Sequence, residues 1–180
     1  MRFLVLNGSP KGKNSITLQT VLYWQKLFPE HLFDILHVGA SIKALEKDFS
    51  AADELIQRAD AFIFSYPVYT FIAPSQLQRF IRLMKEKQLD VRGKFMTQIT
   101  TSKHFYDVTA HRYIEQNCQD MGMKIVHGLS ADMDDLPTEK GQRDAESFFD
   151  WFLWCMEQDI HEAEAAQPAS FIPKPVSPLP

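Results

Sequence analysis

The chain has 180 residues, of which 45% are hydrophobic, and its formal net charge is −4 at pH 7. This length suits one globular domain with a substantial core. Lysine and arginine are scattered, which argues against a nucleic-acid partner because contact with phosphate backbones needs clustered cations. With no apolar run long enough for a membrane span or a signal peptide, the sequence predicts a cytoplasmic protein without a membrane partner.

Short apolar runs alternate with segments of helical periodicity along the chain. The apolar runs predict five strands, at residues 1–7, 31–38, 61–67, 94–102 and 123–128. Segments with apolar residues three and four positions apart predict five helices, at residues 15–28, 49–60, 74–87, 105–122 and 143–166. This alternation indicates an α/β fold with a parallel sheet and helices on both faces. Because such sheets bind ligands outside the carboxyl ends of their strands, the loops after the first, third and fourth strands are the candidate sites.

We expect one domain over residues 1–166, followed by a proline-rich tail over residues 167–180. The tail carries five prolines, so it suits neither a helix interior nor a central strand. It is either a linker to a further domain after Pro180 or an arm, held to its own domain or to a second subunit by Phe171, Ile172, Val176 and Leu179. The last predicted helix is apolar nearly all round, which favours cover by this tail or by a second subunit in a homo-oligomer.

The sequence contains little that indicates a metal ion or an iron–sulfur cluster. Cys118 and Cys155 lie far apart with no CxxC pair, so neither a disulfide framework nor an iron–sulfur ligand set is visible. The loop with Asp132, Asp134 and Asp135 lacks the glycine and the closing glutamate of an EF-hand. We therefore predict a solvated acidic loop and no metal site.

The loop "NGSPKGKNS" after the first strand has the character of an anion site. Gly8 and Gly12 allow the backbone to turn and approach a ligand, and the free amides at the start of the next helix stabilise an anion. A Walker A loop is one residue longer and carries Ser or Thr where Asn14 stands, and the GxGxxG of dinucleotide folds is absent. The monophosphate of FMN and an ordinary loop capped by Ser15 remain as interpretations.

The loop after the third strand adds the more specific pattern. "GSPxxxxS" after the first strand and "PxYxxxxPxxLxxFI" after the third, together and in this order, resemble the NADPH-dependent FMN reductase group of flavodoxin-like proteins over residues 1–136. This group includes relatives of iron–sulfur flavoproteins, whose cluster cysteines are missing here. The resemblance implies a flavodoxin-like three-layer sandwich, with a five-stranded parallel sheet and FMN at its carboxyl edge.

The resemblance also implies which residues contact FMN. Around the phosphate it places Ser9, Lys11, Asn14, Ser15, Thr17 and the backbone amide of Ile16. Along the isoalloxazine ring it places Pro67, Val68, Tyr69 and Phe71. At the other edge of the ring it places Thr100, Thr101 and Ser102.

The function predicted from this resemblance is an FMN-binding oxidoreductase. NAD(P)H would supply electrons, which pass through FMN to a small acceptor such as a quinone, free flavin or a metal. No catalytic side chain is required, although His104 could reach the flavin. Two alternatives remain: a flavodoxin-type electron carrier that docks to a protein partner without nicotinamide turnover, and a flavin-sensing or scaffolding domain.

Overall fold

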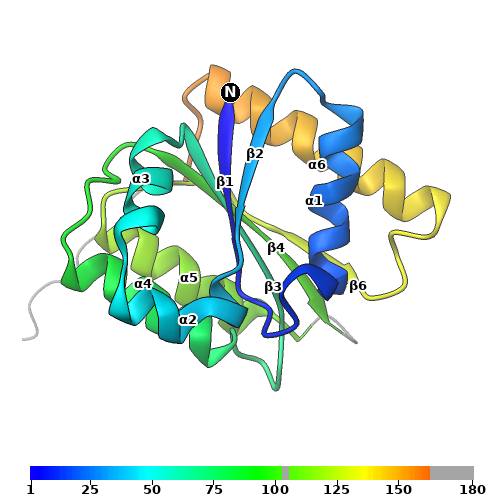
Figure 1. The fold of residues 1–180 in the computed structure, drawn as a ribbon. Helices are drawn as coiled ribbons and strands as arrows, with labels where there is room; N and C mark the ends of the chain where they lie inside the picture. Colours follow the sequence, from blue (N-terminus) through cyan, green and yellow to red (C-terminus); the bar gives the residue numbers. More distant parts are fainter. Residues whose placement is uncertain (103–105, 163–180) are drawn as a thin grey trace, which may run out of the picture.

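The computed structural model describes residues 1–102 and 106–162, and their centre is a parallel sheet (Figure 1). Its strands run in the order β2-β1-β3-β4-β5, which is the flavodoxin-like order that the sequence implied. Their bounds are β1 Arg2–Asn7, β2 Leu32–Leu36, β3 Ala61–Pro67, β4 Phe95–Ser102 and β5 Lys124–Ile125. A short sixth strand, β6 Leu129–Asp132, pairs in parallel with the end of β4.

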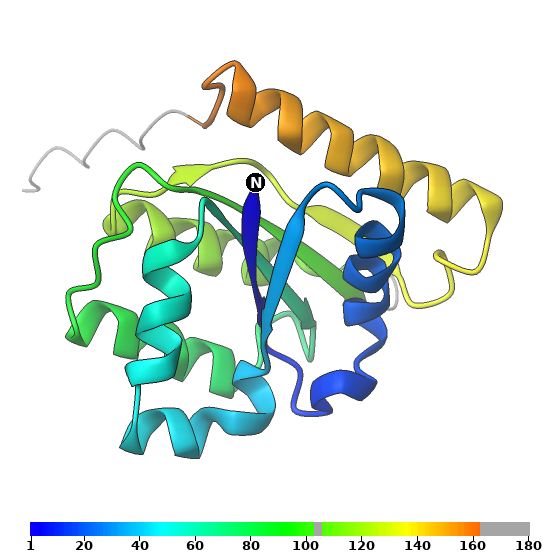
Figure 2. The same cartoon turned by 45° about the horizontal axis from the view of Figure 1, so that its top comes forward.

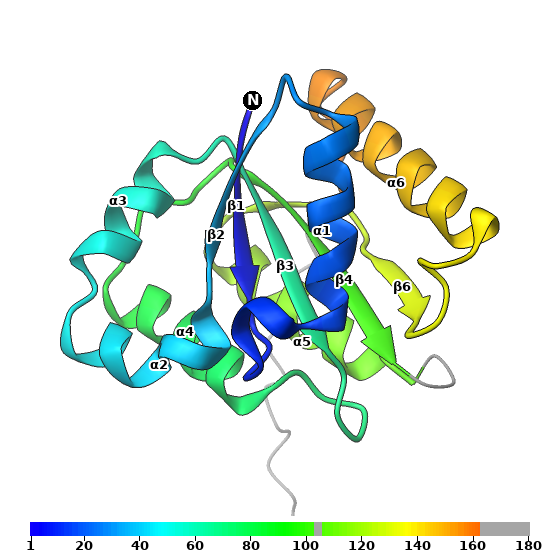
Figure 3. The ribbon, with the colours of Figure 1, turned by 45° about the vertical axis from the view of Figure 1, so that its right-hand side comes forward.

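Helices cover both faces of the sheet, as predicted. One face carries α1 Ile16–Leu27 and α6 Glu139–Glu157, which Figure 3 shows together on one side. The other face carries α2 Val38–Lys47, α3 Ser50–Arg58, α4 Ser75–Glu86 and α5 Val108–Asp120. Figure 2 shows α6, in orange, lying across its face of the sheet. The three-layer sandwich is therefore confirmed.

Strand periodicity divides the core into two halves. In β1, Phe3 and Val5 pack toward α1 and α6, whereas Leu4 and Leu6 pack toward the other helices. Successive side chains of a strand point to opposite faces, so an apolar run without alternation is what a sheet covered on both faces requires.

Three elements differ from their predicted bounds. The helix α2 was not predicted, and the predicted strand over residues 31–38 ends at Leu36 because α2 begins at Val38. The predicted strand over residues 123–128 is shorter, and the chain then pairs again as β6, where a loop was expected. The last helix starts earlier, at Glu139, because Thr138 caps it: Thr138 Oγ1 accepts a hydrogen bond from Gly141 N at 3.0 Å. It also ends earlier than predicted, at Glu157, and residues 158–162 are not helical.

Several predictions fall on residues outside the described part. These predictions concern His104, Phe105 at the start of the predicted helix over residues 105–122, the end of the predicted last helix at residues 163–166, and the tail over residues 167–180. The domain boundary at residue 166 stays a prediction for the same reason. Within residues 1–102 and 106–162, no helix has the length and apolar character needed to cross a bilayer. No group of three or more metal-ligating side chains comes together in the same ranges.

Candidate functional site

A cavity of about 260 Å³ lies at the carboxyl edge of the sheet, where β1, β3 and β4 end. This is the switch point at which the chain passes from one side of β1 to the other. Ten of the thirteen predicted site residues line it: Ser9, Lys11, Ser15, Ile16, Thr17, Pro67, Val68, Tyr69, Thr101 and Ser102. Met133, which follows β6, completes the wall and was not predicted.

The loop after β1 is held in place by Asn7, the last residue of that strand. The buried Asn7 side chain donates through Nδ2 to Gly12 O at 2.8 Å and accepts at Oδ1 from Ser9 N at 3.2 Å. Gly12 has a φ of +54°, which favours glycine. Sequence reasoning missed Asn7, although an amide that ends an otherwise apolar buried strand was a visible signal.

The start of α2 presses directly on the same loop. A Cβ atom at Gly39 would lie 2.4 Å from the backbone atoms Gly8 O and Ser9 C. Glycine is therefore the residue that lets α2 approach the loop this closely. The unpredicted helix thus helps to fix the position of the loop.

The start of α1 is arranged to receive an anion. Ser15 is the N-cap residue of this helix, but its side chain caps no amide. Its Oγ is buried and has no hydrogen-bond partner among the described residues. The first amides of α1 and the positive end of its dipole therefore face the cavity without a capping side chain.

A second residue that lines the same cavity also carries a buried hydroxyl. Ser102, the last residue of β4, has an Oγ without a partner among the described residues. Buried polar groups are usually hydrogen-bonded. Two such hydroxyls on residues that line one cavity therefore indicate a site for a polar ligand.

A tight turn with exposed apolar side chains follows β3 and lies at one end of the cavity. Tyr69 and Ile72 exchange backbone hydrogen bonds of 3.2 Å, and between them Thr70 and Phe71 have φ values of +49° and +70°. Such backbone is costly for residues other than glycine and is often found at functional sites. Val68 N donates to Thr101 O at 3.0 Å, so the turn is tied to β4.

Three predicted residues lie outside this cavity. Phe71 lines a smaller neighbouring cavity, where its ring centroid is 5.4 Å from that of Tyr106. Asn14 is exposed in the 3₁₀ turn η1 Gly12–Asn14. Thr100 points to the opposite face of the sheet, where its hydroxyl donates to Asp107 Oδ2 at 2.6 Å.

Thr101 and Thr100 show how strand alternation divides this segment. Thr101 Oγ1 lies 2.6 Å from Thr17 Oγ1 and so joins β4 to α1 beside the cavity. Thr100 Oγ1 lies 2.8 Å from His111 Nε2, in a buried cluster behind the sheet. Burial lowers the pKa of His111, although Asp107 and Glu115 oppose this shift.

The family comparison agrees with this geometry. The sequence model of the NADPH-dependent FMN reductase family matches residues 1–132. The chain belongs to this family. No curated protein matches the chain.

Solved structures show the same fold in other members and relatives. FerB, a flavoenzyme NAD(P)H:(acceptor) oxidoreductase from Paracoccus denitrificans, has a TM-score of 0.70 and 19% identity, over 87% of this chain and 97% of that one. The NADH:FMN oxidoreductase EMOB has a TM-score of 0.69 and 19% identity, over 84% and 87%. An NADPH-quinone reductase from P. pentosaceus has a TM-score of 0.62 and 15% identity, over 84% and 97%. At such identities the likeness establishes the fold.

Family membership makes this chain an NAD(P)H-dependent FMN reductase, with FMN as cofactor and NAD(P)H as co-substrate. The chemistry of the cavity fits FMN, because its lining combines the uncapped start of α1, two hydroxyls without partners among the described residues, and the apolar and aromatic side chains of Pro67, Val68 and Tyr69. Flavin sites of this kind need apolar contacts for the ring and fixed donors for the phosphate.

Proposed function

We propose that the cavity at the carboxyl edge holds FMN and that the enzyme passes electrons from NAD(P)H to a small-molecule acceptor, such as a quinone, free flavin or a metal. The single observation that carries the proposal is that Ser15 and Ser102, which line one cavity, each have a buried hydroxyl without a partner among the described residues. Solved structures described as acting on acceptors, on FMN and on quinone share the fold.

In this proposal each part of the cavity has one task. The amides at the start of α1 and the Ser15 hydroxyl bind the phosphate, with Lys11 supplying a positive charge. Pro67, Val68 and Tyr69 flank the ring and exclude water from one edge of it. When bound, FMN supplies the electron transfer itself, so these residues orient it and no side chain needs to act as acid or base.

Removing either unpaired hydroxyl tests this placement. Ser15→Ala removes a hydrogen bond to the charged phosphate, worth about 1.5–3 kcal/mol, and should raise the FMN Kd roughly ten- to hundredfold. Ser102→Ala removes a neutral ligand hydrogen bond, worth about 0.5–1.5 kcal/mol, and should raise the Kd roughly two- to tenfold. The flavin-free protein should keep its stability, because neither hydroxyl has a partner to lose among residues 1–102 and 106–162. Ser147→Ala, at an exposed position on α6 outside the cavity, serves as the control.

Fluorescence titration with FMN and urea unfolding measure the two quantities. Unchanged FMN affinity in both variants would contradict the placement. Anaerobic addition of NAD(P)H to the FMN-loaded protein separates the enzyme from a flavodoxin-type carrier, because a carrier retains oxidised flavin under these conditions.

We also propose that the enzyme is a homo-oligomer in the cytoplasm. Trp151 and Trp154 on α6 are 42% and 49% exposed, and large exposed aromatic side chains are typical of subunit contacts. Cys118 and Cys155 are unpaired, which suits a reducing compartment. Light scattering on the purified protein measures the mass, and a monomer at micromolar concentration would contradict the first part.

A further inference from the structure

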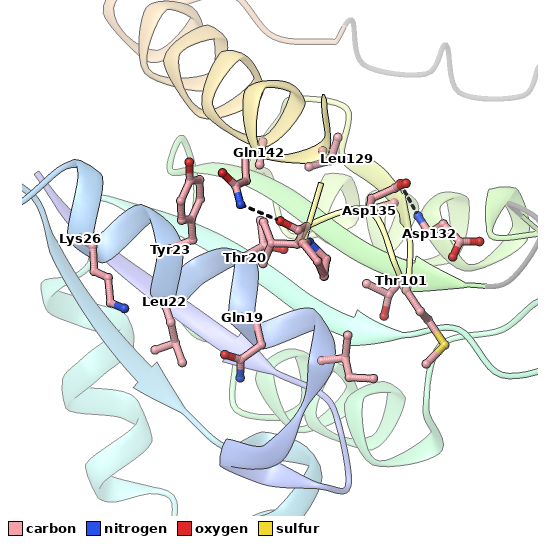
Figure 4. Close-up of a pocket in the computed structure, with 17 residues that line it drawn as sticks. Gln19, Thr20, Leu22, Tyr23, Lys26, Thr101, Leu129, Asp132, Asp135 and Gln142 are labelled. Atoms are coloured by element: carbon pink, nitrogen blue, oxygen red, sulfur yellow. Dashed lines mark hydrogen bonds between the residues drawn. The ribbon is translucent and has the colours of Figure 1, made fainter. Parts of the chain in front are cut away.

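A second and larger cavity, of about 380 Å³ (Figure 4), lies beside the cavity at the carboxyl edge in which we propose that FMN binds. The latter is called the flavin cavity below. It opens between α1, β6 and the start of α6. Three residues, Ile16, Thr101 and Met133, line both cavities. Much of its wall, from Met133 to Ala145, lies beyond residue 132, where the family match ends. Family membership therefore does not account for it.

The wall of this second cavity is mainly apolar. Leucines at positions 22, 129 and 136 contribute to it, together with Ile16, which is 43% exposed in the described chain. Alternation along β6 turns Leu129 and Ala131 into the cavity, while Ser130 points to the other face and donates to Asp107. Cavities of about 300–1,000 Å³ with apolar walls and a few polar groups are typical of small-molecule sites.

A few polar groups project from the two helices. Figure 4 shows Gln142 of α6 reaching into the cavity, where its Nε2 donates to Leu136 O at 3.1 Å. This bond steadies the loop before α6 and leaves the Gln142 carbonyl oxygen able to accept from a ligand. Gln19 makes one long bond of 3.4 Å, to Ser15 O, and its amide also lines the cavity.

The charged side chains that line the second cavity disfavour an anionic ligand. Asp132 and Asp135 line the end nearest Met133, and Lys26 lines the far end of α1. Asp135 Oδ2 accepts from Asp132 N at 2.7 Å, so this carboxylate is held in position. Two carboxylates against one ammonium repel an anion, while the two amides bind a neutral hydroxyl or carbonyl group.

We propose that this second cavity binds a neutral, mainly apolar ring compound at the same time as FMN, with the amides of Gln19 and Gln142 fixing its polar end. Apart from the three shared residues, the walls of the two cavities are separate. The ligand therefore lies directly beside the flavin rather than in its place.

Three naphthalene probes of equal shape and different charge test the proposal. They are 2-naphthalenemethanol, 2-naphthoate and 2-naphthylmethylammonium, titrated by calorimetry into the FMN-loaded full chain. We expect the Kd of 2-naphthalenemethanol to be at least tenfold lower than that of 2-naphthoate. We also expect it to be lower than the Kd of 2-naphthylmethylammonium. Saturating probe should change the FMN Kd less than twofold.

Filling the cavity supplies the matched comparison. Ala131→Phe places a ring inside it and should weaken the neutral probe at least tenfold, whereas Ala51→Phe, at an exposed position on α3, should not. If Ala131→Phe does not fold, Leu136→Ala removes part of the apolar wall and should weaken the probe severalfold.

Other outcomes overturn the proposal. Mutual exclusion of the probe and FMN would place the probe in the flavin cavity. Tightest binding by the ammonium would refute the neutral class. Stronger binding after truncation at Glu162 would mean that the chain's own tail fills the cavity. Failure of the parent to bind FMN would instead refute the proposed function, and the same titrations in flavin-free protein would still test the second cavity.

Discussion

Gly39→Ala tests whether α2 fixes the loop that faces the cavity. The added methyl group would lie 2.4 Å from Gly8 O and Ser9 C, far inside van der Waals contact. Both neighbours are backbone atoms, so no side chain can rotate away to relieve the clash. Overpacking of this kind costs about 1–3 kcal/mol of folding free energy.

The effect on FMN affinity follows from which atoms must move. Relief of the clash shifts Gly8 and Ser9, and with them the loop that Asn7 holds through Ser9 N and Gly12 O. Loss of one hydrogen bond to a charged phosphate costs about 1.5–3 kcal/mol. The FMN Kd should therefore rise roughly ten- to hundredfold.

Gly93→Ala is the control for this experiment. A Cβ added at Gly93 would meet no described atom within 4 Å, but the φ of +74° makes alanine unfavourable by about 1–2 kcal/mol. Both variants should lose comparable stability in urea unfolding, yet only Gly39→Ala should lose FMN affinity in fluorescence titration. If Gly39→Ala binds FMN within twofold of the parent, α2 does not position the loop.

Three further predictions concern the buried polar and sulfur groups. Thr17→Val or Thr101→Val in the flavin-free protein leaves the other hydroxyl buried without its 2.6 Å partner, and each should cost about 1–3 kcal/mol in urea unfolding. The double variant should cost less than the sum, and strict additivity would show that the bond contributes nothing. Burial lowers the pKa of the His111 imidazole below 6.5 in the folded state. As the pH falls below about 6.5, this imidazole is therefore protonated more readily in the unfolded chain, and the free energy of unfolding decreases. His111→Gln should therefore reduce the decrease in unfolding free energy between about pH 7 and pH 5. An unchanged dependence of the unfolding free energy on pH would refute the lowered pKa of His111. Burial raises the thiol pKa of both Cys118 and Cys155, so neither should react with a thiol reagent at pH 8 until urea unfolds the chain; rapid labelling of the native protein would contradict this.

Local patterns predicted the elements that have strong periodicity. The strand β3 is a run of buried residues from Ala61 to Tyr66, and such a run indicates a central strand whatever surrounds it. The helix α2 was missed because its start is decided by tertiary contact: Gly39 would be unfavourable in an isolated helix, yet here it allows close packing on the loop.

The position of each side chain within the candidate site required the sheet. Thr100 and Thr101 are chemically alike and adjacent, so the resemblance placed both beside FMN. Pairing of β4 with β3 and β6 turns Thr101 toward α1 and Thr100 toward α5. Met133 was not predicted, because it reaches the cavity only through the return of the chain as β6.

The sequence by itself determined the parallel α/β fold, and it predicted the carboxyl edge as the place of the candidate site and the loops that line it. These follow from local hydrophobic periodicity and from glycine, serine and proline at turns, which act over a few residues. Only the tertiary structure decided the packing of Gly39 on the loop, the second cavity, and the burial of the Ser15 and Ser102 hydroxyls without a partner among the described residues. Each of these depends on atoms from segments far apart in the chain, whose separation is fixed only when the sheet and both helix layers pack together.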